Sequence, residues 1–169
     1  IVAFSVIGVQ AQEIEEVTVT AQKREQNQQD VPVALDAFTG EMLQQSSIKT
    51  MADLAGMTPA LDAWQSQNAG FSSWGIRSLN TSSQNFGLEA AVGSYVDGVY
   101  RSRQSSIANQ LTDIEAVEIL RGPQGTLFGK NTSAGAVSIR TVAPSHDRNG
   151  FFEVVGGDYG LVNLNAAMN

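Results

Sequence analysis

Glycines spaced between two β-prone runs constrain this chain more than any other feature. The stretch from Leu120 to Arg140, LRGPQGTLFGKNTSAGAVSIR, follows the run EAVEIL (115–120), which has apolar residues on both faces. It leads into a second β-prone run at 136–142. Glycine permits positive φ and close backbone approach, and proline fixes a turn. We therefore expect two strands joined by a compact loop, shaped by Gly122, Pro123, Gly125, Gly129 and Gly135.

The same stretch resembles a phosphate-binding loop only superficially. That loop needs G-x-x-x-x-G-K-[ST] between a strand and a helix. Gln124 stands where the first glycine belongs, and Asn131 rather than a hydroxyl residue follows Lys130. A β-prone run comes next, so no helix N-terminus would face a phosphate. The sequence argues against a nucleotide enzyme.

Composition excludes several other classes of function. A net charge of −7 disfavours a nucleic-acid partner, because phosphate contacts need a basic face. Without cysteine there is no disulfide, thiolate nucleophile or cysteine metal site. His146 is the single histidine and has no nucleophile or orienting acid near it in sequence. Glu115 and Glu118 sit at odd spacing in a predicted strand, so we expect solvated or ion-paired carboxylates rather than a catalytic pair. We predict no catalytic residue, metal or cofactor.

The N-terminal region divides into three parts. Residues 1–11 contain an apolar run ending in Val9-Gln10-Ala11, which indicates the remnant of a signal peptide or, alternatively, a buried strand. The run EIEEVTVTA (13–21) is β-prone. The run QKREQNQQD (22–30) has no apolar residue and predicts a flexible linker. The alternative for the β-prone run is an ordinary edge strand.

Helix and strand signals alternate through the middle of the chain. One helix is expected at 40–46 with Thr39 as N-cap, and another at 50–56 with Thr50 as N-cap and Asp53 at the third helical position. Strands are expected at 61–65, 74–79 and 91–100, the last with an Asp97-Gly98 turn. Polar loops are expected at 65–73 and 80–89.

The amino-acid pattern changes in the last residues of the chain. Two runs, 151–155 and 161–169, surround the glycine-rich turn GGDYG. In the second run Val162, Leu164, Ala166 and Met168 alternate with asparagines. This alternation is typical of an outer-membrane β-barrel strand, with lipid on one side and the lumen on the other. A soluble hairpin with one buried face is the alternative.

Four segments resemble TonB-dependent outer-membrane receptors, and they occur in the family's order between residues 13 and 144. EEVTVTAQKREQ (15–26) resembles the TonB box and linker, and WGIRSLN (74–80) the I-R-G element, with Ser78 where glycine is usual. SYVDGVYRSR (94–103) and IEAVEILRGPQGTLFGKNTSAGAVSIRT (114–141) resemble the end of the plug domain.

The resemblance implies an α+β chain in four parts. They are a signal remnant (1–11), the TonB box with a flexible linker (13–30), a small mixed-sheet plug domain with short helices (31–144), and the first antiparallel strands of an outer-membrane barrel (145–169). A barrel of about 22 strands would need several hundred further residues.

The resemblance also implies site residues. The TonB box residues, which would add as a strand to the periplasmic domain of TonB, are Glu16, Val17, Thr18, Val19 and Thr20. Arg77 and Arg121 match plug arginines that pair with barrel-wall carboxylates; the alternative is a pair of surface arginines. Phe71, Trp74 and Phe86 are candidates for the substrate-facing apex, or else they pack the base of their loops.

The implied function is energised uptake of a scarce nutrient across the outer membrane of a Gram-negative cell, with the plug gating the barrel. The expected partners are TonB, the chain's own barrel and a small-molecule nutrient such as a metal chelate, for example a ferric siderophore. A free periplasmic plug-like binding or interaction module without a barrel is the alternative.

Overall fold

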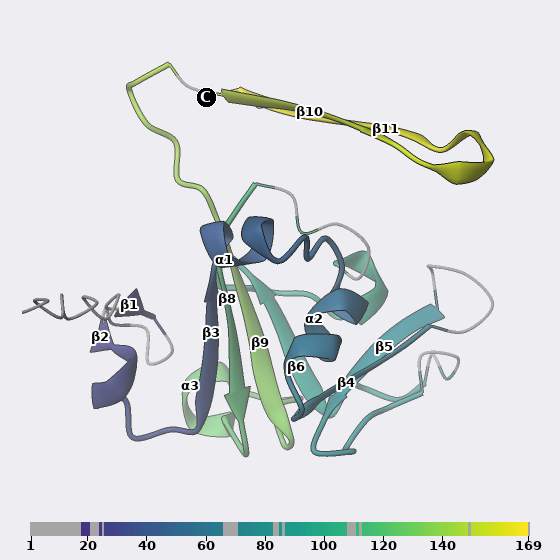
Figure 1. Cartoon of the computed structure of the whole chain (residues 1–169). Coiled ribbons are helices and arrows are strands. Elements are labelled where there is room, and N and C mark those ends of the chain that lie inside the picture. The colour runs from purple at the N-terminus through teal and green to yellow at the C-terminus, as the bar shows by residue number, and fades with distance from the viewer. Residues whose placement is uncertain are drawn as a thin grey trace, which may run out of the picture.

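A mixed five-stranded sheet forms the centre of the molecule (Figure 1). The computed structural model describes residues 18–20, 24, 26–65, 71–82, 85, 87–107, 111, 113–148 and 150–168. The sheet has the order β3-β8-β9-β6-β7, and only the β6–β9 pair is parallel. These strands are β3 (Leu35–Thr39), β6 (Val92–Val96), β7 (Val99–Tyr100), β8 (Ile114–Arg121) and β9 (Gly135–Thr141). The expected α+β class with a mixed sheet is confirmed.

Both faces of the sheet are covered, which accounts for the apolar residues on both sides of β8. Val117 and Ile119 point into a core cluster that also contains Leu43 of the helix α1 (Gly40–Gln45) and Leu54 of the helix α2 (Met51–Met57). Leu120 belongs to a second cluster on the opposite face. Its buried members are Val19, Val31, Leu35, Tyr95, Leu120 and Ala136. Alternate residues of β8 are therefore buried in two separate hydrophobic clusters, one on each face of the sheet.

Two short helices pack on the first face, as the capping signals predict. The helix α1 (Gly40–Gln45) begins after Thr39, whose hydroxyl accepts from the Met42 N–H. The helix α2 (Met51–Met57) begins after Thr50, and Asp53 completes a capping box. Burial of Asp53 by itself would raise its pKa, but hydrogen bonds from the Thr50 side chain and from the Lys49 and Thr50 backbone lower the pKa on balance.

A hairpin of β4 (Leu61–Gln65) and β5 (Ser72–Ile76) lies beside the helices. The strand expected at 74–79 therefore begins two residues earlier and ends three residues earlier. It ends because Arg77 and Ser78 have φ of 55° and 62°, values that leave the β region. The Leu79 N–H donates to the Ile76 carbonyl, which closes this turn, and the Arg77 N–H donates to the Ala60 carbonyl just before β4.

The polar run at 22–30 differs from expectation in its described residues. Gln26–Asn27 form β2, which pairs antiparallel with β1 (Thr18–Val19), and Gln28–Asp30 form the 3-10 helix η1. Asn27 caps η1 by accepting from the Gln29 N–H, and the Gln28 amide donates to the Leu35 carbonyl. Side-chain amides thus give local structure to a run that has no apolar residue.

The last two strands form a separate hairpin, which stands away from the sheet in Figure 1. The strands β10 (Gly150–Gly156) and β11 (Val162–Met168) pair in continuous antiparallel register around η4 (Asp158–Gly160). One face carries Phe152, Val154, Leu164 and Ala166, and the other pairs Glu153 with Asn165. Neither strand has a buried residue: Phe152 on one face is 71% exposed, and Glu153 on the other face is partly exposed. The expected alternation is present, and the choice between a barrel strand and a soluble hairpin stays a prediction.

The remaining elements are the 3-10 helix η3 (Gln104–Ser106) and α3 (Gly125–Phe128), which lies in the loop between β8 and β9. Among the described residues, none of the helices has the length and apolar character needed to cross a membrane.

Candidate functional site

The segment Thr18–Thr20 lies on the face of the five-stranded sheet that carries Leu120 and Ala136, called the second face below. Val19 is fully buried in the cluster that contains Leu35, Leu120 and Tyr95. The strand β1 itself is held by only two register pairs, Thr18 with Asn27 and Val19 with Gln26. The segment is therefore anchored by one apolar side chain and a very short ladder. Glu16 and Val17, the other residues expected to contact TonB, lie outside the described residues, as do residues 1–11.

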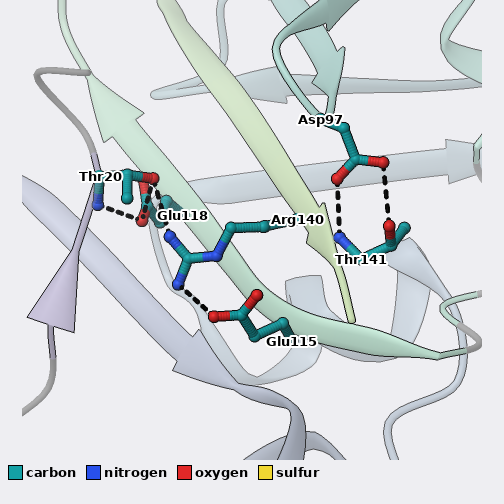
Figure 2. A network of polar contacts seen from close by, with 6 residues as sticks. All are labelled: Thr20, Asp97, Glu115, Glu118, Arg140 and Thr141. Carbon is teal, nitrogen blue, oxygen red and sulfur yellow. Dashed lines mark hydrogen bonds and ion pairs between the residues drawn. The ribbon is translucent and has the colours of Figure 1, made fainter. Parts of the chain in front are cut away.

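A polar network joins Thr20 to the sheet (Figure 2). The Thr20 N–H donates to Glu118 Oε1 at 2.6 Å, and the Thr20 hydroxyl donates to the same oxygen at 3.1 Å. Arg140 Nη1 donates to the Thr20 hydroxyl at 3.1 Å, and Arg140 Nη2 pairs with Glu115 Oε1 at 3.1 Å. The prediction of an ion-paired carboxylate thus holds for Glu115.

Glu118 differs from expectation, because its side chain is not solvated. The residue is only 2% exposed, and its Oε2 has no hydrogen-bond partner. It shares the second face with Leu120, since both occupy even positions of β8. Its buried position follows from the segment above it, which covers the sheet at this point. A sequence pattern of alternating residues cannot show that a segment about 100 positions away provides this cover.

Asp97 makes the turn that its sequence predicts and also clamps the end of β9. Its φ is 49°, and Gly98 follows with φ of 77°, which suits a tight turn between β6 and β7. Its carboxylate accepts from the Thr141 N–H and hydroxyl, both at 2.9 Å (Figure 2). This fixes the strand that carries Arg140.

The two expected lock arginines have different surroundings. Arg121 is half-buried at the end of β8, and its Nη2 pairs with Asp36 of β3 at 3.2 Å. Its Nε is buried without a hydrogen-bond partner. Arg77 is exposed on the turn after β5. A third cation, Lys49, pairs with Glu153 of the terminal hairpin at 2.6 Å.

The glycine-rich loop has the compact shape expected of it, but its glycines serve different purposes. Gly122 and Gly129 have positive φ, of 95° and 80°. Gly135 has φ of 156°, and a Cβ there would lie 2.3 Å from the Leu120 carbonyl oxygen. Gly125 needs neither property, since it lies in α3 with open space beside it, so the expectation for Gly125 was wrong. Lys130 is followed by a strand rather than a helix, which agrees with the absence of a phosphate loop.

A cavity of about 530 Å³ opens between the loops that follow β5 and β7. Its polar lining includes Glu89 and Lys130, which pair at 2.7 Å. This hydrogen bond lowers the pKa of Glu89 and raises that of Lys130. The cavity is lined by Ser72, Thr81, Ser82, Asn85, Leu88, Glu89, Ala90, Tyr100, Ser102, Arg103, Gln104, Ser105 and Lys130.

Of the aromatic residues expected at the apex, neither Phe71 nor Trp74 lines this cavity. Trp74 is 1% exposed and belongs to the first core cluster, so its assignment to a substrate-facing apex was wrong. Its apolar ring is removed from water within the sheet layers. Phe71 is partly buried just before β5, and Phe86 lies outside the described residues.

Gln104 is a structural residue that sequence reasoning missed. Its amide oxygen accepts from the Trp74 N–H and its amide nitrogen donates to the Trp74 and Val92 carbonyls, so it joins β5 of one sheet to β6 of another. A buried glutamine in a polar run has no sequence signal, because its role depends on the two strands that it meets. Within the described ranges, no group of three acidic or histidine residues could hold a metal ion.

The chain is similar in sequence to known proteins. The family model for the TonB-dependent receptor plug domain matches residues 27–136. The pesticin receptor of Yersinia pestis is 37% identical over 111 residues, which make up 66% of this chain and 16% of that protein. The vitamin B12 transporter BtuB of Vibrio vulnificus is 28% identical over 135 residues, covering 75% of this chain and 20% of the transporter. The chain thus spans a fifth or less of the length of these relatives.

The chain is also similar to solved structures of outer-membrane receptors. The ferric yersiniabactin uptake receptor FyuA from Yersinia pestis has a TM-score of 0.61 and 32% identity, over 71% of this chain and 18% of that chain. The ferripyoverdine receptor of the outer membrane of Pseudomonas aeruginosa, bound to ferripyoverdine, has a TM-score of 0.69 at 14% identity, over 89% of this chain and 19% of that chain. At this lower identity the likeness concerns the fold alone.

Proposed function

The chain belongs to the TonB-dependent receptor plug domain family, and from that premise we propose that it is the plug of an outer-membrane receptor for energised uptake of a scarce nutrient. The observation that carries the proposal is the match over residues 27–136, directly after a β-prone segment docked on the plug sheet. The relatives compared here are named as receptors or transporters, which supports a transport role rather than catalysis.

The segment 16–20 is proposed as the contact with the periplasmic domain of TonB. A β-branched peptide that is released from the plug can add as a strand to the edge of a partner's sheet, with main-chain hydrogen bonds carrying the load. Thr18 and Val19 already adopt strand geometry, which lowers the conformational cost of pairing with a new partner. The short ladder to β2 makes exchange of partners feasible.

Contacts between plug and barrel are proposed to use cations of the plug. Arg121 pairs with Asp36 through Nη2 and its side chain is 29% exposed, so the guanidinium can also meet a wall carboxylate. Arg77 presents an exposed guanidinium from the turn after β5. The Lys49–Glu153 pair is a contact of the same type, between the plug and the hairpin proposed as the first barrel strands.

A ferric chelate is the proposed class of substrate, bound in the full receptor over the cavity lined by Glu89 and Lys130. This class rests on FyuA, whose structure is titled a ferric yersiniabactin uptake receptor. The cavity offers hydroxyl, amide and charged groups, which suit a polar chelate.

The proposal is tested by uptake of radiolabelled ferric yersiniabactin and ferripyoverdine into Gram-negative cells that express the full receptor. Val19→Pro removes a strand N–H and should abolish uptake while the cells still bind the chelate. Val19→Thr keeps the N–H and the β-branch, and should transport. Equal uptake by the proline variant and the parent would overturn the proposed role of the segment.

A further inference from the structure

We propose that Glu118 is the positioning residue that holds the TonB-contacting segment closed, so that its carboxylate sets how often Val19 leaves the sheet. The inference deepens the proposed function and rests on it, because it concerns regulation of the same segment. It starts from the position of Glu118, which is the one carboxylate that contacts Thr20 directly in the described part of the chain.

The contacts of Thr20 converge on this single acceptor. Its N–H and its hydroxyl both reach Glu118 Oε1, and the hydroxyl in turn accepts from Arg140. A backbone N–H that loses its acceptor in a buried position costs free energy, because it has also lost its contact with water. One carboxylate oxygen therefore fixes the residue directly after β1, at the point where the two-residue ladder ends.

The geometry of the sheet explains why this carboxylate is available. Glu118 pairs with Ser138 of β9, and Arg140 lies two positions further along the same face. Leu120 and Ala136 of that face pack against Val19. The face therefore has an apolar half that receives Val19 and a polar half that receives Thr20. The segment bridges both halves.

Few contacts hold the closed position, namely the two-residue ladder of β1 and the contacts of Thr20, so release of the segment is feasible. Glu118 Oε2 and Arg140 Nε are both buried without hydrogen-bond partners. A cavity of about 330 Å³ lies beside the network and is lined in part by Thr20, Ser138 and Arg140, so solvent reaches this side of the network while the segment is docked.

Thiol labelling measures release directly, because this chain contains no cysteine and any cysteine elsewhere in the full receptor is replaced by serine first. Val19→Cys places a small apolar thiol at a fully buried position, so maleimide reacts only when the segment leaves the sheet. The experiment uses the full receptor in detergent, without substrate. Glu118→Ala should raise the labelling rate about tenfold, because it leaves the Thr20 N–H without an acceptor in the closed position.

Two further variants keep the result interpretable. Thr20→Val removes the hydroxyl contacts without altering the sheet, and should also raise the labelling rate. In the double variant with Glu118→Ala, Thr20→Val should raise the labelling rate by a smaller factor than it does alone. Glu41→Ala is the matched control, because Glu41 is an exposed glutamate of α1, and α1 packs on the opposite face of the sheet. The labelling rate of Val19→Cys should be the same with and without Glu41→Ala.

Binding of the TonB periplasmic domain without substrate separates the inference from the proposed function. A parallel rise in labelling and TonB affinity in Glu118→Ala supports both. Faster labelling with no TonB binding under any condition supports the role of Glu118 and overturns the proposed partner. Labelling unchanged in both Glu118→Ala and Thr20→Val overturns the role of Glu118, whatever TonB does.

Discussion

At the scale of single residues, two glycines of the same loop should respond oppositely to alanine. Gly135→Ala would place its Cβ 2.3 Å from the Leu120 carbonyl oxygen and 2.6 Å from Ile76 Cδ1, in a strained backbone conformation. We expect the free energy of unfolding of the chain to fall by roughly 3 kcal/mol. Urea titration followed by tryptophan fluorescence measures this, since Trp74 is buried in the core.

Gly125→Ala is the matched control. Gly125 lies in α3 with open space around its Cα, and alanine is the better helix former by up to about 1 kcal/mol. The free energy of unfolding should be unchanged or slightly higher. Equal losses for the two variants would contradict the account of this loop.

The same residues show how far sequence reasoning extends at this scale. The turn at Asp97-Gly98 follows from local backbone chemistry, so it could be predicted. Trp74, Gln104 and Glu118 are buried by segments distant in sequence, and their roles could not be read from their neighbours. Local rules identify the turn residues, whereas tertiary contacts decide which polar or aromatic groups are buried.

At the scale of elements, the capping box of α2 should contribute stability that depends on pH. Hydrogen bonds lower the pKa of Asp53 in the folded chain despite its partial burial. Its contribution is therefore complete above the unfolded pKa and is lost as the pH falls through the folded pKa. Asp53→Ala should cost about 1 kcal/mol at neutral pH and progressively less in acid.

Glu41→Ala provides the comparison for this helix prediction. Glu41 is an acid in the first turn of α1, but Thr39 caps that helix and no capping box is present. At neutral pH, Glu41→Ala should lower the free energy of unfolding by less than Asp53→Ala does in the same denaturation series. A loss for Asp53→Ala that stays constant down to strongly acidic pH would refute the pH dependence.

Elements with strong local signals were the most predictable. Thr39 and Thr50 mark both helix starts, and 61–65 is a strand with the expected bounds. The polar run at 22–30 predicts a linker because it has no apolar residue. Its described residues instead form β2 and η1, through pairing with β1, the Asn27 cap on Gln29 and the bond from Gln28 to the Leu35 carbonyl.

At the scale of the whole molecule, the two faces of the terminal hairpin should behave differently in a membrane. Leu164 lies on the uniformly apolar face opposite Val154, whereas Asn163 lies on the polar face. In the full receptor, Leu164→Arg should reduce the folded fraction, because an arginine facing lipid near the midplane costs about 2–4 kcal/mol. Asn163→Arg should fold normally, and heat-modifiable migration on gels measures both. Equal folding of the two variants would contradict the lipid-facing assignment.

The central claim is that residues 16–20 connect the plug to TonB. The most direct test is the affinity of the TonB periplasmic domain for the full receptor, purified with a ferric chelate bound, measured by calorimetry for the parent and for Val19→Pro. The account predicts at least about a tenfold weaker Kd for the proline variant, because proline fixes φ near −65° and removes a main-chain donor from the strand that would be added. An unchanged Kd would contradict it and would place the contact with TonB elsewhere in the receptor.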